Sequence, residues 1–180
     1  MTRRIGVLVS GEGTNLQALI DAGLPIVAVA SNRKQARALD RARAVGIPAA
    51  TFSLDRNASR EARDLVMATW LMEHEVALVV LAGFMHLLTR PFLDRFPGMI
   101  VNVHPSLLPR FPGAHATDDA LAADVETTGV TIHYVDEGLD TGAVITQEPV
   151  RVDPRETLVE RIHAVEHRLL PQVVGELCAL

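Results

Sequence analysis

The sequence predicts an α/β fold: a doubly wound, mainly parallel sheet with an antiparallel C-terminal extension and a long C-terminal helix. Three observations lead to this prediction. Apolar runs alternate with segments of helical periodicity through about the first hundred residues, which is typical of parallel strands joined by right-handed crossovers. The apolar run 76–83 is continuous, as expected of a strand covered on both faces. The last third changes pattern, to two alternating segments followed by one long helical stretch.

Each element of the parallel part has its own local signal. The expected strands are short apolar runs bounded by glycine, proline or polar residues. The helices between them repeat apolar residues at helical spacing, and Ser59, with acidic residues in the turn that follows it, is typical of an N-cap. We expect strands at 3–10, 26–31, 49–53, 76–83 and 99–104, and helices at 14–23, 33–46 and 60–75.

The C-terminal third differs from the rest of the chain. Segments 128–136 and 142–150 alternate apolar and polar residues around a short turn region, which predicts a hairpin or an antiparallel extension of the sheet. A long helix is expected after Pro154. No linker, low-complexity tract or internal repeat interrupts the sequence, so we expect a single domain spanning 1–180.

Composition narrows the class of protein. The 180 residues are 48% hydrophobic and 22% charged, with a formal net charge of −5, which is typical of a soluble globular protein and argues against a broad nucleic-acid surface. Cys178 is the only cysteine, so an internal disulfide and a multi-cysteine zinc site are excluded. No apolar run approaches the length of a membrane span. We therefore expect a cytoplasmic protein without nucleic-acid or membrane partners.

Polar groups follow three of the expected parallel strands. They are SGEGTN (10–15) after the first strand, AGFMH (82–86) after the fourth and NVHPS (102–106) at the end of the fifth. In a doubly wound sheet, ligands bind beyond the carboxyl ends of the strands. The sequence therefore predicts one site to which these three segments contribute.

The first of these segments resembles a phosphate-binding turn. The backbone N–H groups of Gly13, Thr14 and Asn15 would lie at the start of a helix, where they can hold a phosphate. The dinucleotide fingerprint is not met, because Leu16 stands where its third glycine would be. A tight turn with no ligand is the alternative interpretation.

Asn102 and His104 are polar residues in an otherwise apolar strand, and their spacing places both on one face. An asparagine amide can donate to a developing oxyanion, and an imidazole can carry a proton near neutral pH. Asp140, in a short glycine-containing loop, is the candidate carboxylate to orient the imidazole and stabilise its cation, with Asp136 and Glu137 as rivals. The alternatives are a satisfied polar pair and an ordinary turn aspartate.

A metal centre is not expected. His163 and His167 have helical i, i+4 spacing, but no third ligand accompanies them. A serine or cysteine nucleophile also lacks a supporting pattern around it.

Four segments then give a resemblance. GVLVSGEGTNLQALID, VVLAGFMHLL, VNVHPSLLPRFPGAH and GVTIHYVDEGLDTGAVI occur in this order. Together they resemble the glycinamide ribonucleotide formyltransferases, folate-dependent enzymes of purine biosynthesis, from about residue 4 to about residue 172. The resemblance implies a Rossmann-like formyltransferase fold and a single formyltransferase domain over 1–180.

The resemblance also implies an activity. A formyl group would pass from 10-formyltetrahydrofolate, the co-substrate, to the amine of glycinamide ribonucleotide by direct attack through a tetrahedral intermediate. No metal, nucleic acid or membrane would take part, and the enzyme would be a cytoplasmic monomer or homodimer. By similarity, the catalytic residues would be Asn102, His104 and Asp140, and the substrate would be bound by Gly13, Thr14, Asn15 and Glu166. The folate would be bound by Arg60, Phe84, Met85, His86, Leu87, Leu88, Leu93, Asp136, Glu137 and Gly138.

The sequence departs from the family at some positions. The family commonly has arginine where this chain has His86, and it often has more basic residues where this chain has Ala116 to Asp119. These changes leave the three catalytic candidates untouched. A formyltetrahydrofolate hydrolase and a non-catalytic module that binds folate or nucleotide are the alternative functions.

Overall fold

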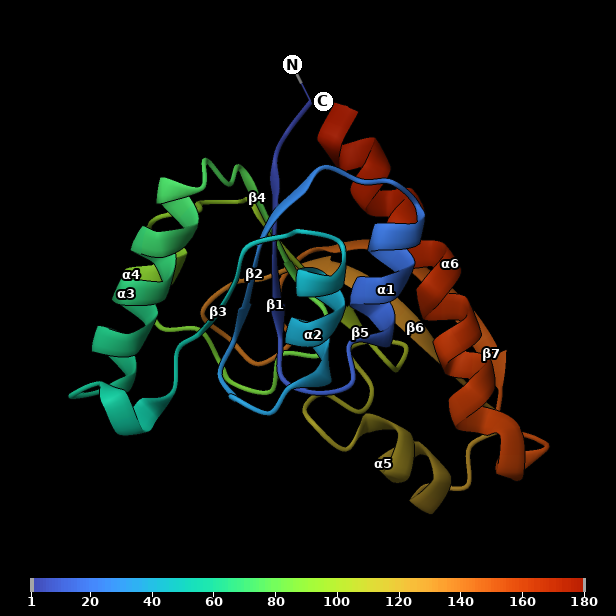
Figure 1. The fold of residues 1–180 in the computed structure, drawn as a ribbon. Coiled ribbons are helices and arrows are strands. Elements are labelled where there is room, and N and C mark those ends of the chain that lie inside the picture. The colour runs from blue at the N-terminus through green and yellow to red at the C-terminus, as the bar shows by residue number, and fades with distance from the viewer. Residues whose placement is uncertain (1, 180) are drawn as a thin grey trace.

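The computed structural model describes residues 2–179, in which seven strands form one sheet (Figure 1). The strand order is β3-β2-β1-β4-β5-β6-β7, with parallel pairing from β3 through β5 and antiparallel pairing of β6 and β7. This confirms the predicted parallel sheet with an antiparallel extension. The strands are β1 (Ile5–Val9), β2 (Ile26–Ser31), β3 (Ala49–Thr51), β4 (Leu78–Leu81), β5 (Ile100–His104), β6 (Thr127–Tyr134) and β7 (Val144–Arg151).

Helices follow most of the parallel strands. The N-cap prediction at Ser59 is confirmed, because its Oγ accepts a hydrogen bond of 3.1 Å from the Ala62 N–H. The long C-terminal helix is also confirmed, although a 3₁₀ turn at Arg155–Thr157 precedes it and it begins at Leu158. The helices are α1 (Thr14–Asp21), α2 (Arg37–Ala44), α3 (Arg60–Glu73), α4 (Arg90–Leu93), α5 (Ala116–Ala122) and α6 (Leu158–Ala179).

One helix start was predicted wrongly, and two short helices were not predicted. The helix expected from residue 33 begins at Arg37, because the Arg33 N–H donates to Ser31 Oγ at 3.0 Å and the chain turns there before becoming helical. The helices α4 and α5 were not predicted. They have four and seven residues, too few to show a periodic apolar face.

Two helical layers enclose the sheet. α1, α2 and α6 cover one face and α3 and α4 cover the other, as Figure 1 shows. Successive residues of β1 point to opposite faces of the sheet. Val7 packs into the first core, between the sheet and α1, α2 and α6, whereas Leu8 packs with Met67 of α3 and Phe92 of α4 in the second core, on the other face. β4 is buried along its whole length, which explains its unbroken apolar sequence.

The sheet also fixes where a ligand can bind. The chain runs from β1 outward to β2 and β3, and then returns to place β4 on the other side of β1. The connections after β1 and β4 therefore leave in opposite directions, and the carboxyl ends of the two strands border a crevice. Within residues 2–179, no helix combines the length and the apolar character needed to span a bilayer.

Candidate active site

A cleft of about 720 Å³ lies at the carboxyl ends of β1, β4 and β5. The volume is typical of a small-molecule site. All three segments expected to meet there contribute to its lining, together with the loop after β6 and one side of α6. The predicted convergence of polar segments at one edge of the sheet is thus present in the structure.

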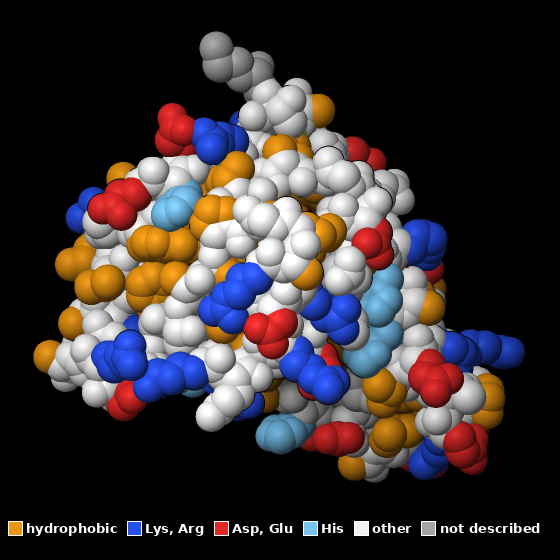
Figure 2. All heavy atoms as spheres, in the orientation of Figure 1, with side chains coloured by type: hydrophobic (Ala, Val, Ile, Leu, Met, Phe, Trp, Pro, Cys, Tyr) orange, Lys and Arg blue, Asp and Glu red, His pale blue; other side chains and the backbone are white. Residues whose placement is uncertain are grey.

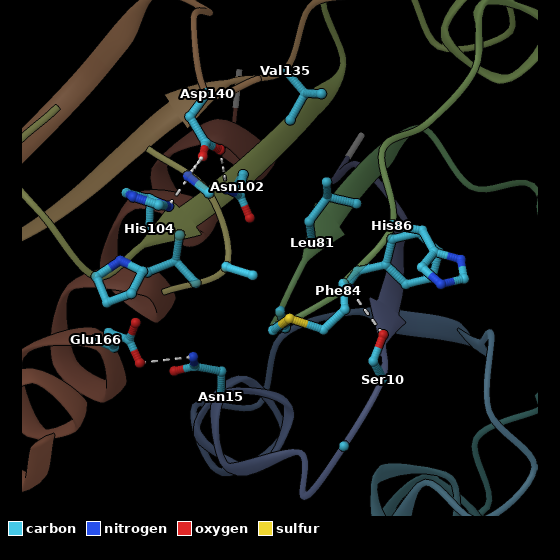
Figure 3. A pocket seen from close by; sticks show the side chains of 18 of the residues that line it. Ser10, Asn15, Leu81, Phe84, His86, Asn102, His104, Val135, Asp140 and Glu166 are labelled. Carbon is cyan, nitrogen blue, oxygen red and sulfur yellow. Dashed lines mark hydrogen bonds and ion pairs between the residues drawn. The ribbon is translucent and has the colours of Figure 1, made fainter. Parts of the chain in front are cut away.

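The structure brings Asn102, His104 and Asp140 together (Figure 3). β5 carries Asn102 and His104, and the loop between β6 and β7 returns Asp140 to them. Asn102 Nδ2 lies 3.5 Å from Asp140 Oδ1, and His104 Nδ1 lies 3.4 Å from Asp140 Oδ2. The carboxylate therefore contacts both candidate groups with its two different oxygens.

Both nitrogens of His104 face acceptors. Its Nε2 donates to the carbonyl oxygen of Phe111 at 2.8 Å, while its Nδ1 faces Asp140. Carbonyl and carboxylate oxygens only accept hydrogen bonds, so the ring satisfies both neighbours only when each nitrogen carries a hydrogen. Because Nε2 is engaged by Phe111, a substrate can reach the ring only at Nδ1, which also faces Asp140 over 3.4 Å.

Asp140 is held as a carboxylate. The Gly113 N–H donates to its Oδ2 at 2.8 Å, and His133 Nε2 lies 3.6 Å from its Oδ1. Burial acts to raise the pKa of Asp140, but the imidazole of His133, the Gly113 amide and the charges of His104 and His133 outweigh it and hold the pKa below its usual 3.8. A charged carboxylate therefore lies beside His104 at neutral pH, where it can balance a positive charge that forms on the ring during a reaction.

Two parts of this cluster escaped the sequence analysis. His133 pairs with Asn102 across the antiparallel β5–β6 ladder, and Asn102 Nδ2 lies 3.1 Å from its Nε2. The pattern that singled out Asn102, a polar side chain in an apolar strand, is also present at His133 and could have identified it. The role of the Phe111 carbonyl could not be predicted from the sequence. Its direction depends on a backbone φ of +53°, which is uncommon for phenylalanine.

The glycine loop lies at the start of α1. Gly13 is the N-cap and has a φ of +76°, a conformation that favours glycine. A β-carbon added to Gly13 would lie 2.5 Å from the Cβ of Ala38, so α2 packs directly on this turn. Gly13, Thr14 and Asn15 all line the cleft.

Gly13→Ala is expected to lower the free energy of unfolding by about 1–3 kcal/mol, because it adds both backbone strain and overpacking. Urea unfolding measures the change. Gly11→Ala is the matched control, since a β-carbon there meets nothing within 4 Å. Equal losses in the two variants would contradict the role given to the Gly13–Ala38 contact.

Asn15 and Glu166 form a buried pair at the same end of the cleft (Figure 3). Asn15 Nδ2 donates to Glu166 Oε2 at 3.0 Å, and the Oδ1 of Asn15 is buried with no hydrogen-bond partner. Burial raises the pKa of Glu166 to about 7, an effect that the bond from Asn15 only partly offsets. The pair thus offers a free acceptor and a titrating carboxyl to a ligand.

The raised pKa of Glu166 predicts a pH effect on stability. Between the usual value of 4.5 and about 7, the folded chain holds a proton that the unfolded chain has released. The free energy of unfolding should therefore fall as pH rises through this window. Glu166→Gln should flatten this slope and exceed the wild type in stability above the window, as measured by urea unfolding across pH. The exposed Glu160→Gln is the control, and a slope unchanged by Glu166→Gln would contradict the assignment.

The residues expected to bind folate form the opposite wall of the cleft. Phe84, Met85, His86, Leu87 and Leu88 follow β4 and line it, as do Asp136 and Gly138 from the β6–β7 connection. Three other expected residues do not line it: Arg60 is exposed at the start of α3, Leu93 packs against the second core, and Glu137 lies 3.8 Å from Arg90. Their roles stay predictions.

A metal site is not formed by the described residues. Within 2–179, no group of three or more His, Cys, Asp or Glu side chains is placed to hold an ion. His163 lines the cleft and stacks on His167, with ring centroids 5.9 Å apart.

Comparison with known proteins agrees with this site. The family model described as formyl transferase matches residues 3–174. A phosphoribosylglycinamide formyltransferase of Mycobacterium tuberculosis is 44% identical over 182 residues, which cover 97% of this chain and 84% of that protein. The trifunctional purine biosynthetic protein adenosine-3 of Drosophila pseudoobscura pseudoobscura is also 44% identical, over 188 residues and 98% of this chain, but the chain spans only 14% of its length.

Solved structures show the same fold. The crystal structure of glycinamide ribonucleotide transformylase 1 from Geobacillus kaustophilus superimposes with a TM-score of 0.95 at 41% identity, covering 99% of this chain and 100% of that one. The family model and the M. tuberculosis relative each cover nearly the whole chain. This chain belongs to the formyl transferase family.

Proposed function

We propose that this chain transfers the formyl group of 10-formyltetrahydrofolate to the primary amine of glycinamide ribonucleotide in purine biosynthesis. The observation that carries the proposal is the cluster of Asn102, His104 and Asp140 between a phosphate-type turn and an apolar wall of one cleft. Relatives named for this activity support it. The proposal includes a single formyltransferase domain, a cytoplasmic location, and a monomer or homodimer.

The nucleotide would lie against α1 and α6. Its phosphate would accept hydrogen bonds from the N–H groups of the Gly13 turn, where the α1 helix dipole favours an anion. Figure 2 shows Lys and Arg side chains gathered over α2, beside this turn, although the whole chain has a net charge of −5. The Asn15–Glu166 pair would face the glycinamide end of the same molecule.

The formyl donor would lie along the wall that follows β4. Met85 (53% exposed), Leu87 (49%) and Leu139 (48%) all line the cleft, which is unusual exposure for large apolar side chains. A flat heteroaromatic ring would cover this surface, so the residues present fit a folate. The formyl carbon would then come to rest near the ends of β4 and β5.

The chemistry follows from the three clustered side chains. The substrate amine is the nucleophile, so no covalent bond to the protein is required. Asn102 Nδ2 has two hydrogens, and the one directed to Asp140 over 3.5 Å can turn to an oxyanion at the formyl carbon. The imidazolium of His104 would stabilise the same charge through Nδ1, and Asp140 would hold that ring and balance its charge. Asp140 can also relay the proton that the amine loses, directly or through a water.

A formyltetrahydrofolate hydrolase would use the same side chains with water in place of the amine. The Gly13 turn and the Asn15–Glu166 pair favour the transferase, because they form a second polar end of the cleft that a water nucleophile does not need. The test follows loss of the formyl donor with and without glycinamide ribonucleotide. Loss only with the nucleotide supports the transferase, equal loss without it supports the hydrolase, and binding of folate without any loss supports a non-catalytic module.

A further inference from the structure

A buried ion pair lies beneath the apolar wall of the cleft. Arg63 and Asp64 of α3 are both fully buried, with Arg63 Nε 2.6 Å from Asp64 Oδ1, an ion pair whose orientation is not that of a hydrogen bond. Removing two charges from water is costly, and apolar residues of similar volume often serve stability as well or better. A contribution to stability alone therefore does not explain why an ion pair is buried at this position.

The pair is tied to the segment 83–89, which we call the donor wall. Asp64 Oδ2 accepts two hydrogen bonds of 2.8 Å from Thr89, one from its N–H and one from its Oγ1. Arg63 Nη1 lies 3.0 Å from Nδ1 of His86, and its guanidinium carbon lies 5.8 Å from the Phe84 ring centroid. Both members of the ion pair thus hold the same seven-residue segment.

The donor wall is also anchored from the other side. The Met85 N–H donates to Ser10 Oγ at 2.9 Å, and Ser10 lies 2.6 Å from Asn32 Oδ1. Asn32 reaches the second nitrogen of His86, with Nδ2 3.2 Å from Nε2. In Figure 3 the His86 ring lies across the cleft from Asp140, away from the catalytic candidates.

The contact with Arg63 requires a neutral His86. A guanidinium only donates, so Nδ1 must keep its lone pair and Nε2 must carry the hydrogen. As placed, Asn32 directs its Nδ2 to His86 and its Oδ1 to Ser10. The hydrogen on Nε2 therefore requires the amide to be turned end for end, so that Oδ1 accepts from His86 and Nδ2 donates to Ser10 Oγ, which also accepts from the Met85 N–H. The charged groups that face His86 agree: after burial, Arg63, Arg60 and Arg33 lower its pKa, and Asp64 alone opposes them.

We propose that Arg63 and Asp64 are positioning residues for the formyl donor, and that they hold the donor wall through a neutral His86 and through Thr89. The inference rests on the proposed function, since it assigns this wall to the folate. Loss of either link should let the wall move, weakening donor binding while the nucleotide end and the catalytic cluster remain as they are.

Two substitutions at His86 separate these roles. His86→Gln keeps an acceptor for Arg63 and a donor for Asn32, whereas His86→Leu removes both. We expect His86→Leu to raise the KM for the donor by about tenfold or more, the order expected when a buried donor loses its partner, with kcat and the nucleotide KM within about twofold. His86→Gln should restore the donor KM. If both variants raised it equally, or if His86→Leu left it unchanged, the positioning role would be refuted.

A second pair of variants tests the Asp64 link. Thr89→Val removes one of the two hydrogen bonds to Asp64 with little change in side-chain shape. Thr69→Val is the control, because it removes a hydroxyl hydrogen bond within α3, from Thr69 Oγ1 to the Leu65 carbonyl oxygen at 2.9 Å. Binding of 5-formyltetrahydrofolate, a stable isomer of the donor, is measured by calorimetry. We expect several-fold weaker binding for Thr89→Val and no change for Thr69→Val. Equal affinities would count against the link.

The tautomer can be read without any activity. Nitrogen NMR of the His86 ring at neutral pH should show a hydrogen on Nε2 and none on Nδ1. A charged ring or the opposite tautomer would overturn the proposal. If instead the wild-type chain bound no folate while His86 showed the expected tautomer, the proposed function would fail and the network itself would stand.

Discussion

His104→Ala is expected to lower kcat for formyl transfer by at least about a thousandfold, the range seen when an acid–base or oxyanion group is removed. Among Asn102, His104 and Asp140, the His104 imidazole is the group that can present a positive charge to the developing oxyanion. Its removal should leave KM for both substrates nearly unchanged, because the glycine turn and the donor wall lie elsewhere in the cleft. Steady-state rates with each substrate varied in turn measure the effect.

The fold should survive this change. The Phe111 carbonyl would keep a hydrogen bond from Ser106 Oγ, which lies 3.2 Å away. His74→Ala is the control, since His74 caps the far end of α3 and contacts Trp70. Retention of more than about a tenth of the wild-type kcat in His104→Ala would rule out the role given to the ring.

Asp140→Asn is expected to depress kcat by about a hundredfold to ten-thousandfold. The amide keeps an oxygen for the Gly113 N–H, but it has no charge to balance the imidazolium and cannot accept a proton. Asp136→Asn and Glu137→Gln are matched controls in the same loop. Asp136 accepts from the Gly138 N–H and Thr141 Oγ1, and Glu137 lies beside Arg90, so neither reaches His104.

The same variant has a pH signature in stability. Because the folded-state pKa of Asp140 is lowered, its contribution is present above the unfolded value of 3.8 and is lost as pH falls through the folded one. The wild type should therefore exceed Asp140→Asn in unfolding free energy near neutral pH, and this gap should close under acid. A gap that persisted unchanged in acid, or full activity in Asp140→Asn, would show that another carboxylate performs this function.

Much of the candidate site could be predicted from the sequence, because its polar residues stand out where apolar residues are expected. Asn102 and His104 interrupt an apolar strand, and Asp140 follows a turn that could return to it. The glycine loop could be predicted for a different reason: glycines between an expected strand and an expected helix indicate a tight turn, and Gly13 does have a positive φ that other residues avoid.

What the sequence did not reveal depends on backbone direction and tertiary pairing. The Phe111 carbonyl reaches His104 through a loop whose path no residue type specifies. Arg63 and Asp64 belong to a helix whose sequence contains many charged residues, as an exposed helix does. Their burial becomes evident only in the structure, where the donor wall packs over α3. The short helices α4 and α5 were missed because so few residues display no period.

The most direct test of the account uses a formyl donor labelled at its formyl carbon. The purified chain is mixed with labelled 10-formyltetrahydrofolate and glycinamide ribonucleotide, and the products are separated and analysed by NMR. We expect the label on the former amine nitrogen of the nucleotide, in amounts equal to the tetrahydrofolate released. Label recovered as free formate, with the nucleotide unmodified, would contradict formyl transfer as the function of this cleft.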